Sequence, residues 1–270
     1  MLGKLFKYDI KSLGRFIFPL YAVLFGSAIA VRIFFEFFGS GADASGAAAF
    51  VYRLIGSVVA IVYFLAIMAS IFGVYVVIAI NYNKSLMSDR GYFYLTLPVS
   101  HDMHLVGKLL AGAVLILLSV IVFVLSFLPF FIGNIHLPDV LKVLTEAWDT
   151  IRELFLSKNA WLILTLMAIV CLFGVQILIF FCITVGQLLP GHRILGAFLA
   201  FIVHTIFSRT IAGVFASVGL ERLDFNVFDM DVIGEALSGI LLRSIIYYLI
   251  IYVVEYIITR YVMKNKLNIE

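Results

Sequence analysis

Charge is scarce in this chain of 270 residues. Asp, Glu, Lys and Arg make up 13% of it, 64% is hydrophobic, and the mean hydropathy is +1.14. Soluble domains are about a quarter charged and about half apolar. This composition excludes an ordinary soluble domain and predicts a polytopic membrane protein. The net charge of +3 also excludes the broad basic field that nucleic-acid binding requires, so we expect no nucleic-acid partner.

Cysteine is rarer still, with two residues in one apolar stretch, Cys171 and Cys182. On a helix their separation along the axis is ~16 Å, which is too long for a disulfide between them. We therefore interpret both as buried, apolar thiols.

Sequence motifs for catalysis are absent as well. The chain has no G-x-x-x-x-G-K-[ST] loop for ATP, no H-E-x-x-H, no Cys/His metal spacing and no G-x-S-x-G elbow. His101 and His104 are three residues apart, but we interpret them as a polar cap on the span that follows, with Ser100 as its N-cap. We therefore predict no catalytic residue, no metal site and no cofactor in this chain.

What the chain has instead is six apolar runs of the length that crosses a bilayer, about 20 residues each. They predict an all-α polytopic fold, one transmembrane domain over 1–270. The turn signal Pro190–Gly191 in "LPGHR" predicts a tight helical hairpin between the fourth and fifth runs. The predicted spans are Phe16–Phe38, Leu54–Ile80, Leu105–Gly133, Trp161–Leu189, Ile194–Val218 and Leu237–Val262.

The distribution of lysine and arginine predicts the orientation of the spans. Basic residues are more frequent at the N-terminus, at the C-terminus and in the segments 81–104 and 190–193 than in the remaining loops. Both termini and these two segments are therefore expected in the cytoplasm. The loop "ERLDFNVFDMD" before the sixth span is acidic, which supports its place outside.

Two segments outside the spans have an amphipathic, helical period. In residues 1–15 apolar positions alternate with Lys4, Lys7, Lys11 and Arg15, which predicts an interfacial helix on anionic headgroups. The alternative is a simple orientation signal before the first span. Residues 138–156, which begin with Pro138, predict a second amphipathic helix on the outer surface.

Some polar side chains fall inside the predicted spans. Gln176 lies in the fourth, and His204 and Arg209 lie in the fifth. Ionisable groups at membrane depth usually face a protein interior or a wet cavity. These three are candidates to line a cavity, and the alternative is that they only pack. Arg32 and Glu36, four residues apart, are expected either to pair with each other or to snorkel to the interface.

The segment between the second and third spans is the most distinctive. Asn83 or Ser85 can cap a short helix over Lys84–Arg90, and Gly91 is a natural stop. The sequence "NYNKSLMSDRGYFYLTLPVSHDMHLVGKLL" resembles the first cytoplasmic loop of bacterial ABC type-2 (exporter-class) transporter permeases. "VGQLLPGHRILG" resembles that family's second cytoplasmic loop, and "MLGKLFKYDIKSLGR" resembles its N-terminal interfacial helix.

The resemblance implies a permease subunit in the bacterial cytoplasmic (inner) membrane, driven by a separate ATPase subunit that binds ATP and Mg. A second permease chain, identical or similar, would complete the transporter, and membrane lipid would surround it. The family's coupling helix corresponds here to Asn83, Lys84, Ser85, Leu86, Met87, Ser88, Asp89, Arg90 and Gly91, and its secondary cytoplasmic contact corresponds to Gln187, Gly191, His192 and Arg193.

By the same resemblance, the transporter would export a hydrophobic or amphipathic substrate, such as a peptide antibiotic, a lipid or a drug, by alternating access. Two other functions remain open from the sequence. One is a non-transporting membrane module or sensor within an ABC complex. The other is an intramembrane enzyme, for which the polar groups in the spans are sparse.

Overall fold

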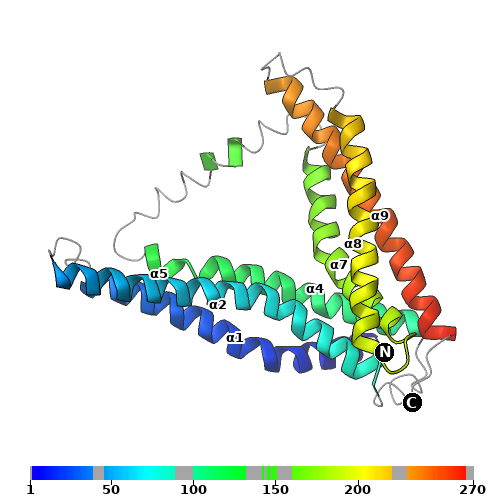
Figure 1. Cartoon of the computed structure of the whole chain (residues 1–270), viewed down its shortest axis with the longest axis horizontal. Coiled ribbons are helices and arrows are strands. Elements are labelled where there is room, and N and C mark those ends of the chain that lie inside the picture. Colours follow the sequence, from blue (N-terminus) through cyan, green and yellow to red (C-terminus); the bar gives the residue numbers. More distant parts are fainter. Residues whose placement is uncertain are drawn as a thin grey trace. The chain divides into compact units, whose positions relative to one another are not determined.

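The part of the chain that the structure describes consists of helices and short turns. The computed structural model describes residues 2–38, 46–88, 100–131, 142, 145–146, 148–150, 160–220 and 230–265. Its helices are α1 (Leu2–Phe38), α2 (Ala47–Leu86), α4 (His101–Leu125), α5 (Leu128–Phe131), α7 (Ala160–Gly186), α8 (Arg193–Leu220) and α9 (Met230–Asn265) (Figure 1).

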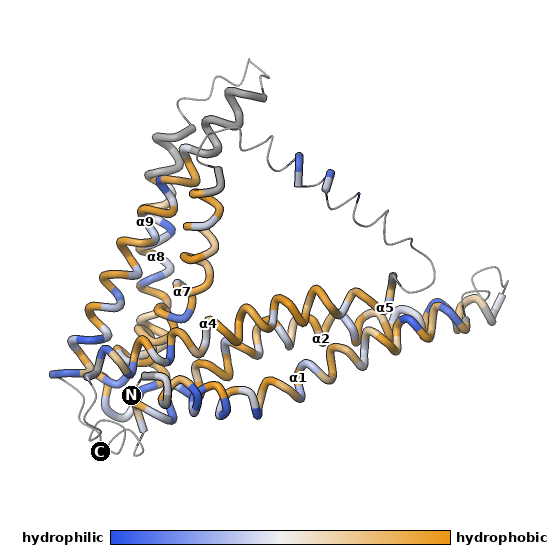
Figure 2. Tube along the Cα trace, turned by 180° about the vertical axis from the view of Figure 1, so that it is seen from behind, coloured by the Kyte–Doolittle hydropathy of each residue, from blue (hydrophilic) through white to orange (hydrophobic). Residues whose placement is uncertain are grey.

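Six of these helices are long and apolar enough to cross a membrane. Figure 2 shows apolar residues along most of their length. The result confirms the six predicted helical spans and fits a multi-pass membrane protein. The candidate spans are Leu5–Phe37, Ala49–Leu86, Asp102–Phe130, Leu162–Gly186, Arg193–Val214 and Gly239–Asn265.

The chain forms two compact units, and the first combines 1–81 with 110–140. In this unit α1 and α2 run antiparallel, because Phe34 stacks on Tyr52 with ring centroids 5.3 Å apart while Ser12 donates a hydrogen bond to Asn81. The hydroxyl of Tyr21 bonds to that of Ser119, which fixes α1 on the later part of α4.

The first helix differs from the sequence prediction. Residues 1–15 were expected as an interfacial helix separate from the span 16–38, but α1 is one unbroken helix of 37 residues with Pro19 inside it. Its buried face continues across the expected boundary through Leu13, Ile17 and Leu24. This continuous packing accounts for the unbroken helix, although Pro19 removes one backbone hydrogen bond. Arg32 and Glu36 pair as predicted, at 3.2 Å.

The second helix also continues beyond its predicted end. A separate short helix was expected over Lys84–Arg90, but α2 continues through Leu86. Neither Gly nor Pro interrupts the sequence between Ile80 and Leu86, and Tyr82 and Leu86 are fully buried, so the packed face extends into the last turn. Asp89, Arg90 and Gly91 lie outside the described residues, as does most of the predicted outer helix 138–156.

The second unit combines 82–109 with 141–270 and contains α7, α8 and α9. Figure 1 shows these three helices side by side. Ile163, Val170 and Ile245 form a buried apolar cluster between α7 and α9. A Cβ atom placed on Gly174 would lie 2.2 Å from the ring of Tyr252, so this glycine is what lets α9 approach α7 closely.

Candidate functional site

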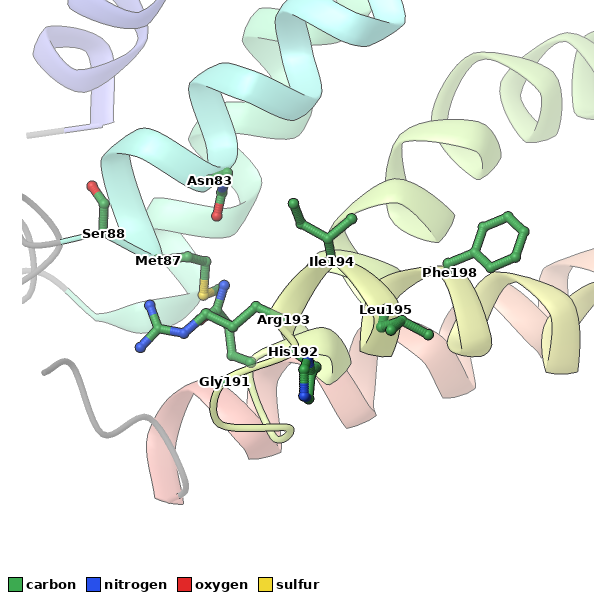
Figure 3. Close-up of a pocket in the computed structure, with 10 residues that line it drawn as sticks. Asn83, Met87, Ser88, Gly191, His192, Arg193, Ile194, Leu195 and Phe198 are labelled. Atoms are coloured by element: carbon green, nitrogen blue, oxygen red, sulfur yellow. The ribbon is translucent and has the colours of Figure 1, made fainter.

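The second unit contains an open groove of about 940 Å³, which we call the end groove. It lies between the last turn of α2 and the α7–α8 hairpin, at the beginning of α8 (Figure 3). Its lining residues are Asn83, Met87, Ser88, Gln187, Gly191, His192, Arg193, Ile194, Leu195 and Phe198.

Tyr82 fixes the α2 side of the end groove. Its side chain is fully buried, and its hydroxyl shares a hydrogen bond of 2.7 Å with Thr184 Oγ1 of α7. The Tyr82 ring stacks on Phe180, with centroids 4.0 Å apart and planes 9° from parallel. The hydroxyl also lies 3.6 Å from the sulfur of Met263 on α9. One residue thus joins the end of α2 to α7 and α9.

A tight turn forms the opposite side. His192 N–H donates to the carbonyl of Leu189 at 3.3 Å, with Pro190 and Gly191 between them. Gly191 has φ +87°, a left-handed conformation that favours glycine. A type II turn has proline as the first of its two central residues and a glycine with positive φ as the second. The predicted hairpin is therefore confirmed.

Two glycines bring the arms of the hairpin into backbone contact. A Cβ atom on Gly186 would lie 2.6 Å from the carbonyl oxygen of Arg193, and a Cβ atom on Gly196 would lie 3.0 Å from Gly186 Cα. Because the neighbouring atoms are backbone, neither position has room for a side chain. This approach places His192 and Arg193 at the groove.

The end groove is amphipathic, and none of the described residues that line it is acidic. Asn83, Gln187, His192 and Arg193 supply hydrogen-bonding and basic groups, and Figure 3 shows the Arg193 side chain extending toward the end of α2. Ile194 is 89% exposed, and Leu195 and Phe198 are also exposed. Exposed apolar groups next to basic ones are suited to contact with another protein or with lipid.

The structure brings together residues from both segments predicted to contact a partner. Asn83, Met87 and Ser88 come from the first, and Gln187, Gly191, His192 and Arg193 come from the second. Other members of the first segment are placed differently. Lys84 is exposed but does not line the groove, whereas Ser85 and Leu86 are buried against the chain itself.

The three polar residues predicted inside the spans do not line the end groove. Gln176 is fully buried on α7 and donates to the carbonyl of Leu172 at 2.9 Å. His204 of α8 pairs through Nδ1 with Glu255 of α9. Arg209 is exposed on α8.

Within the described part of the chain, no group of three or more His, Cys, Asp or Glu side chains could hold a metal ion.

An ion pair anchors the other end of the predicted cytoplasmic segment. Ser100 accepts a hydrogen bond from Met103 N–H at 3.4 Å, as expected of an N-cap of α4. Asp102, in the first turn, pairs with Arg260 of α9 at 2.8 Å. The sequence offered no signal for this pair or for Tyr82–Thr184, because both join residues distant in the chain.

Comparison of the chain with protein-family models, with curated proteins and with solved structures finds no match in any of the three.

Proposed function

We propose that this chain is the membrane-spanning permease subunit of an ATP-driven transporter of the ABC type. In this proposal the end groove receives a soluble ATPase subunit, which binds ATP and Mg. The single observation that carries the proposal is the lining of the end groove. Two segments about a hundred residues apart each resemble a partner-contacting loop in the sequence, and residues of both line one open groove.

The contacts around the groove support a mechanical role. Tyr82 joins the end of α2 to α7 and α9, and the Asp102–Arg260 pair joins the beginning of α4 to α9. A partner that pulls on the groove would therefore move α7 and α9 with the ends of α2 and α4. Packed helices transmit such displacements because their interiors have little free volume.

In the proposed mechanism, ATP binding closes a pair of ATPase subunits, and the two permease chains follow. The path between the chains then changes its access from one side of the membrane to the other. The second permease chain is a copy of this one or a similar chain. The substrate is hydrophobic or amphipathic, in keeping with the apolar spans, and the membrane is the bacterial cytoplasmic membrane.

The test is to tag the chain, extract it gently from its native membrane and identify co-purified proteins by mass spectrometry. We expect an ATPase subunit with a Walker loop. Arg193→Glu should reduce its recovery about tenfold, which corresponds to roughly 1.4 kcal/mol of binding free energy. The charge-matched control is Arg53→Glu. This change alters an exposed residue near the beginning of α2, whereas the groove residues follow at the end of α2, so recovery of the ATPase should be unchanged.

Recovery of the same ATPase with the native chain and with Arg193→Glu would show that the subunit binds elsewhere. Absence of any ATPase, in a detergent that preserves such complexes, would contradict the proposed function as a whole.

A further inference from the structure

A smaller groove of the second unit lies between α7 and α9, and we call it the span groove. It has a volume of about 180 Å³, and its surface is almost wholly apolar. Gly174 has no side chain, so the ring of Tyr252 lies close to the α7 backbone at the groove. Ile169 and Val253, which also line it, are exposed, so the groove is open to the surroundings of the two helices.

The span groove lies at the depth of lipid acyl chains. Thr184 of α7 and Met263 of α9 both contact the Tyr82 hydroxyl, so α7 and α9 end at a similar level. Gly174 lies ~18 Å along the helix axis from Gly186, the last residue of α7. The hydrocarbon layer is ~30 Å thick, which places Gly174 well inside it. An acyl chain is therefore the surrounding medium that can enter the groove.

The size of the span groove also favours an acyl chain. Pockets for drug-sized ligands have volumes of roughly 300–1,000 Å³. The span groove is smaller, and the described residues that line it present almost no polar surface to orient a substrate. It can hold part of one hydrocarbon chain. Because the bilayer is apolar too, packing alone gives such a chain little preference for the groove, so a lipid that stays there needs a polar contact as well.

Arg260 lies beyond the end of the span groove that is nearer to the membrane surface. It follows the groove residue Tyr256 by four residues, so it lies on the same face of α9, one turn or ~6 Å further along. It lies ~8 Å before Asn265, the last residue of α9. Arginine side chains near a helix end reach the headgroup layer. The groove and Arg260 therefore match the chain and the headgroup of one lipid molecule.

The charges around Arg260 leave it able to bind a phosphate. Its side chain is 56% exposed, and its guanidinium pairs with Asp102 at 2.8 Å. Tyr256 is in electrostatic contact with both residues. A guanidinium has more N–H donors than one carboxylate uses, and phosphate oxygens accept such bonds strongly. Because Asp102 balances the positive charge, we expect recognition of the phosphate itself and no strong selection for lipids of net negative charge.

From this geometry we propose that the span groove and Arg260 form a binding site for one phospholipid molecule. One acyl chain lies in the groove between α7 and α9, and the phosphate accepts hydrogen bonds from Arg260. The lipid belongs to the leaflet on the side of the end groove, which is the cytoplasmic leaflet in the orientation that lysine and arginine predict. The bound chain would extend the packing of α7 on α9. The site requires only that these two helices span a membrane.

The test is native mass spectrometry of the full chain, delipidated in detergent and titrated with phosphatidylethanolamine. Diacylglycerol with the same acyl chains, which lacks the phosphate, is the control ligand. We expect one phospholipid per chain to bind with an affinity about tenfold higher than that of diacylglycerol, the scale of one charge-assisted hydrogen bond. Arg260→Gln should remove this difference. Asp102→Asn breaks the ion pair but keeps Arg260, so it should leave phospholipid binding at least as strong.

Two neighbouring valines of α9 provide a matched pair for the groove itself. Val253 and Val254 are 55% and 48% exposed, and only Val253 is among the described residues that line the groove. Val253→Trp puts a ring in the space of the acyl chain and should weaken phospholipid binding about threefold, because packing contacts are lost. Val254→Trp should leave binding unchanged. Since both side chains are exposed, neither change requires the core to repack.

Equal affinities for phospholipid and diacylglycerol would overturn the proposal, because the phosphate would then not be recognised. Equal losses in Arg260→Gln and Asp102→Asn would also overturn it, since the ion pair would then act only by holding the helices. A change in the proportion of dimer in Val253→Trp, with lipid binding unaltered, would show instead that a second copy of the chain covers the groove. None of these measurements requires the ATPase, so their failure is distinct from failure of the proposed transport function.

Discussion

Tyr82 and Thr184, 102 residues apart in the sequence, share a fully buried hydrogen bond of 2.7 Å between their hydroxyl groups. The bond lies where the last turn of α2 meets α7. It holds one wall of the end groove to the bundle of α7, α8 and α9, and the stacked Phe180 ring keeps Tyr82 in place.

This bond can be tested by a double-mutant cycle. Tyr82→Phe removes the hydroxyl and keeps the stacked ring, and Thr184→Val removes its partner. Each single change removes one hydroxyl and leaves the other buried without this hydrogen bond. It should therefore lower the free energy of unfolding by about 1–3 kcal/mol. Because the double change removes both groups, its cost should be clearly less than the sum of the two. Unfolding in mixed micelles by SDS titration gives these energies. Strict additivity would mean that the two hydroxyls do not interact.

The hairpin predicts opposite effects for two glycine substitutions. Gly186→Ala should destabilise the chain by about 1–3 kcal/mol, because its Cβ atom would meet backbone atoms of α8 that cannot move aside. Gly213→Ala, on α8, adds a Cβ atom in open space and should be neutral or should stabilise by up to about 1 kcal/mol through helix propensity. Thermal unfolding of both variants in the same detergent measures the contrast. Equal effects would refute the close approach of α7 and α8.

The Asp102–Arg260 pair should contribute little to stability, although its atoms are 2.8 Å apart. Both side chains are more than a third exposed, so water and salt screen the pair. Asp102→Asn should lower the free energy of unfolding by about 1 kcal/mol or less, and added salt should reduce the difference. A loss of several kcal/mol, insensitive to salt, would show that the pair is buried in the membrane protein as it exists in lipid.

The orientation proposed from lysine and arginine places the end groove in the cytoplasm. With both native cysteines changed to alanine, a cysteine at His192 should react with a membrane-impermeant maleimide in inverted vesicles and not in intact cells. A cysteine at Gly46, which precedes α2 and is exposed, should show the reverse. The opposite labelling pattern would place the groove outside, where no ATP-driven subunit could reach it.

The sequence predicted those features that local chemistry encodes. Long apolar runs predicted the six helices, and Pro190–Gly191 predicted the turn. The four-residue spacing of Arg32 and Glu36 predicted their ion pair. Helix ends were less predictable. Residues 1–15 and the segment Lys84–Leu86 continue the helical period of the neighbouring spans, and Gly14 and Pro19 do not interrupt α1, so no local signal marks the predicted boundaries.

The contacts that build the site lie beyond sequence reasoning. Thirteen tyrosines occur in the chain, and the hydrogen bond of Tyr82 to Thr184 of α7 could not be read from any local pattern around it. His204 was recognised as a polar residue within a span, but its partner Glu255 is 51 residues away on another helix. Such pairs depend on which helices meet and at what height.

The most direct test of the central claim, that the end groove receives an ATPase, is site-specific photocrosslinking in the native cell. A photoreactive amino acid at position 192, in the groove, is compared with one at Val214, an exposed residue further along α8. We expect a crosslink from position 192 to a protein with a Walker loop, and none to that protein from position 214. Crosslinks from position 192 to lipid alone, in cells that produce the ATPase, would contradict it.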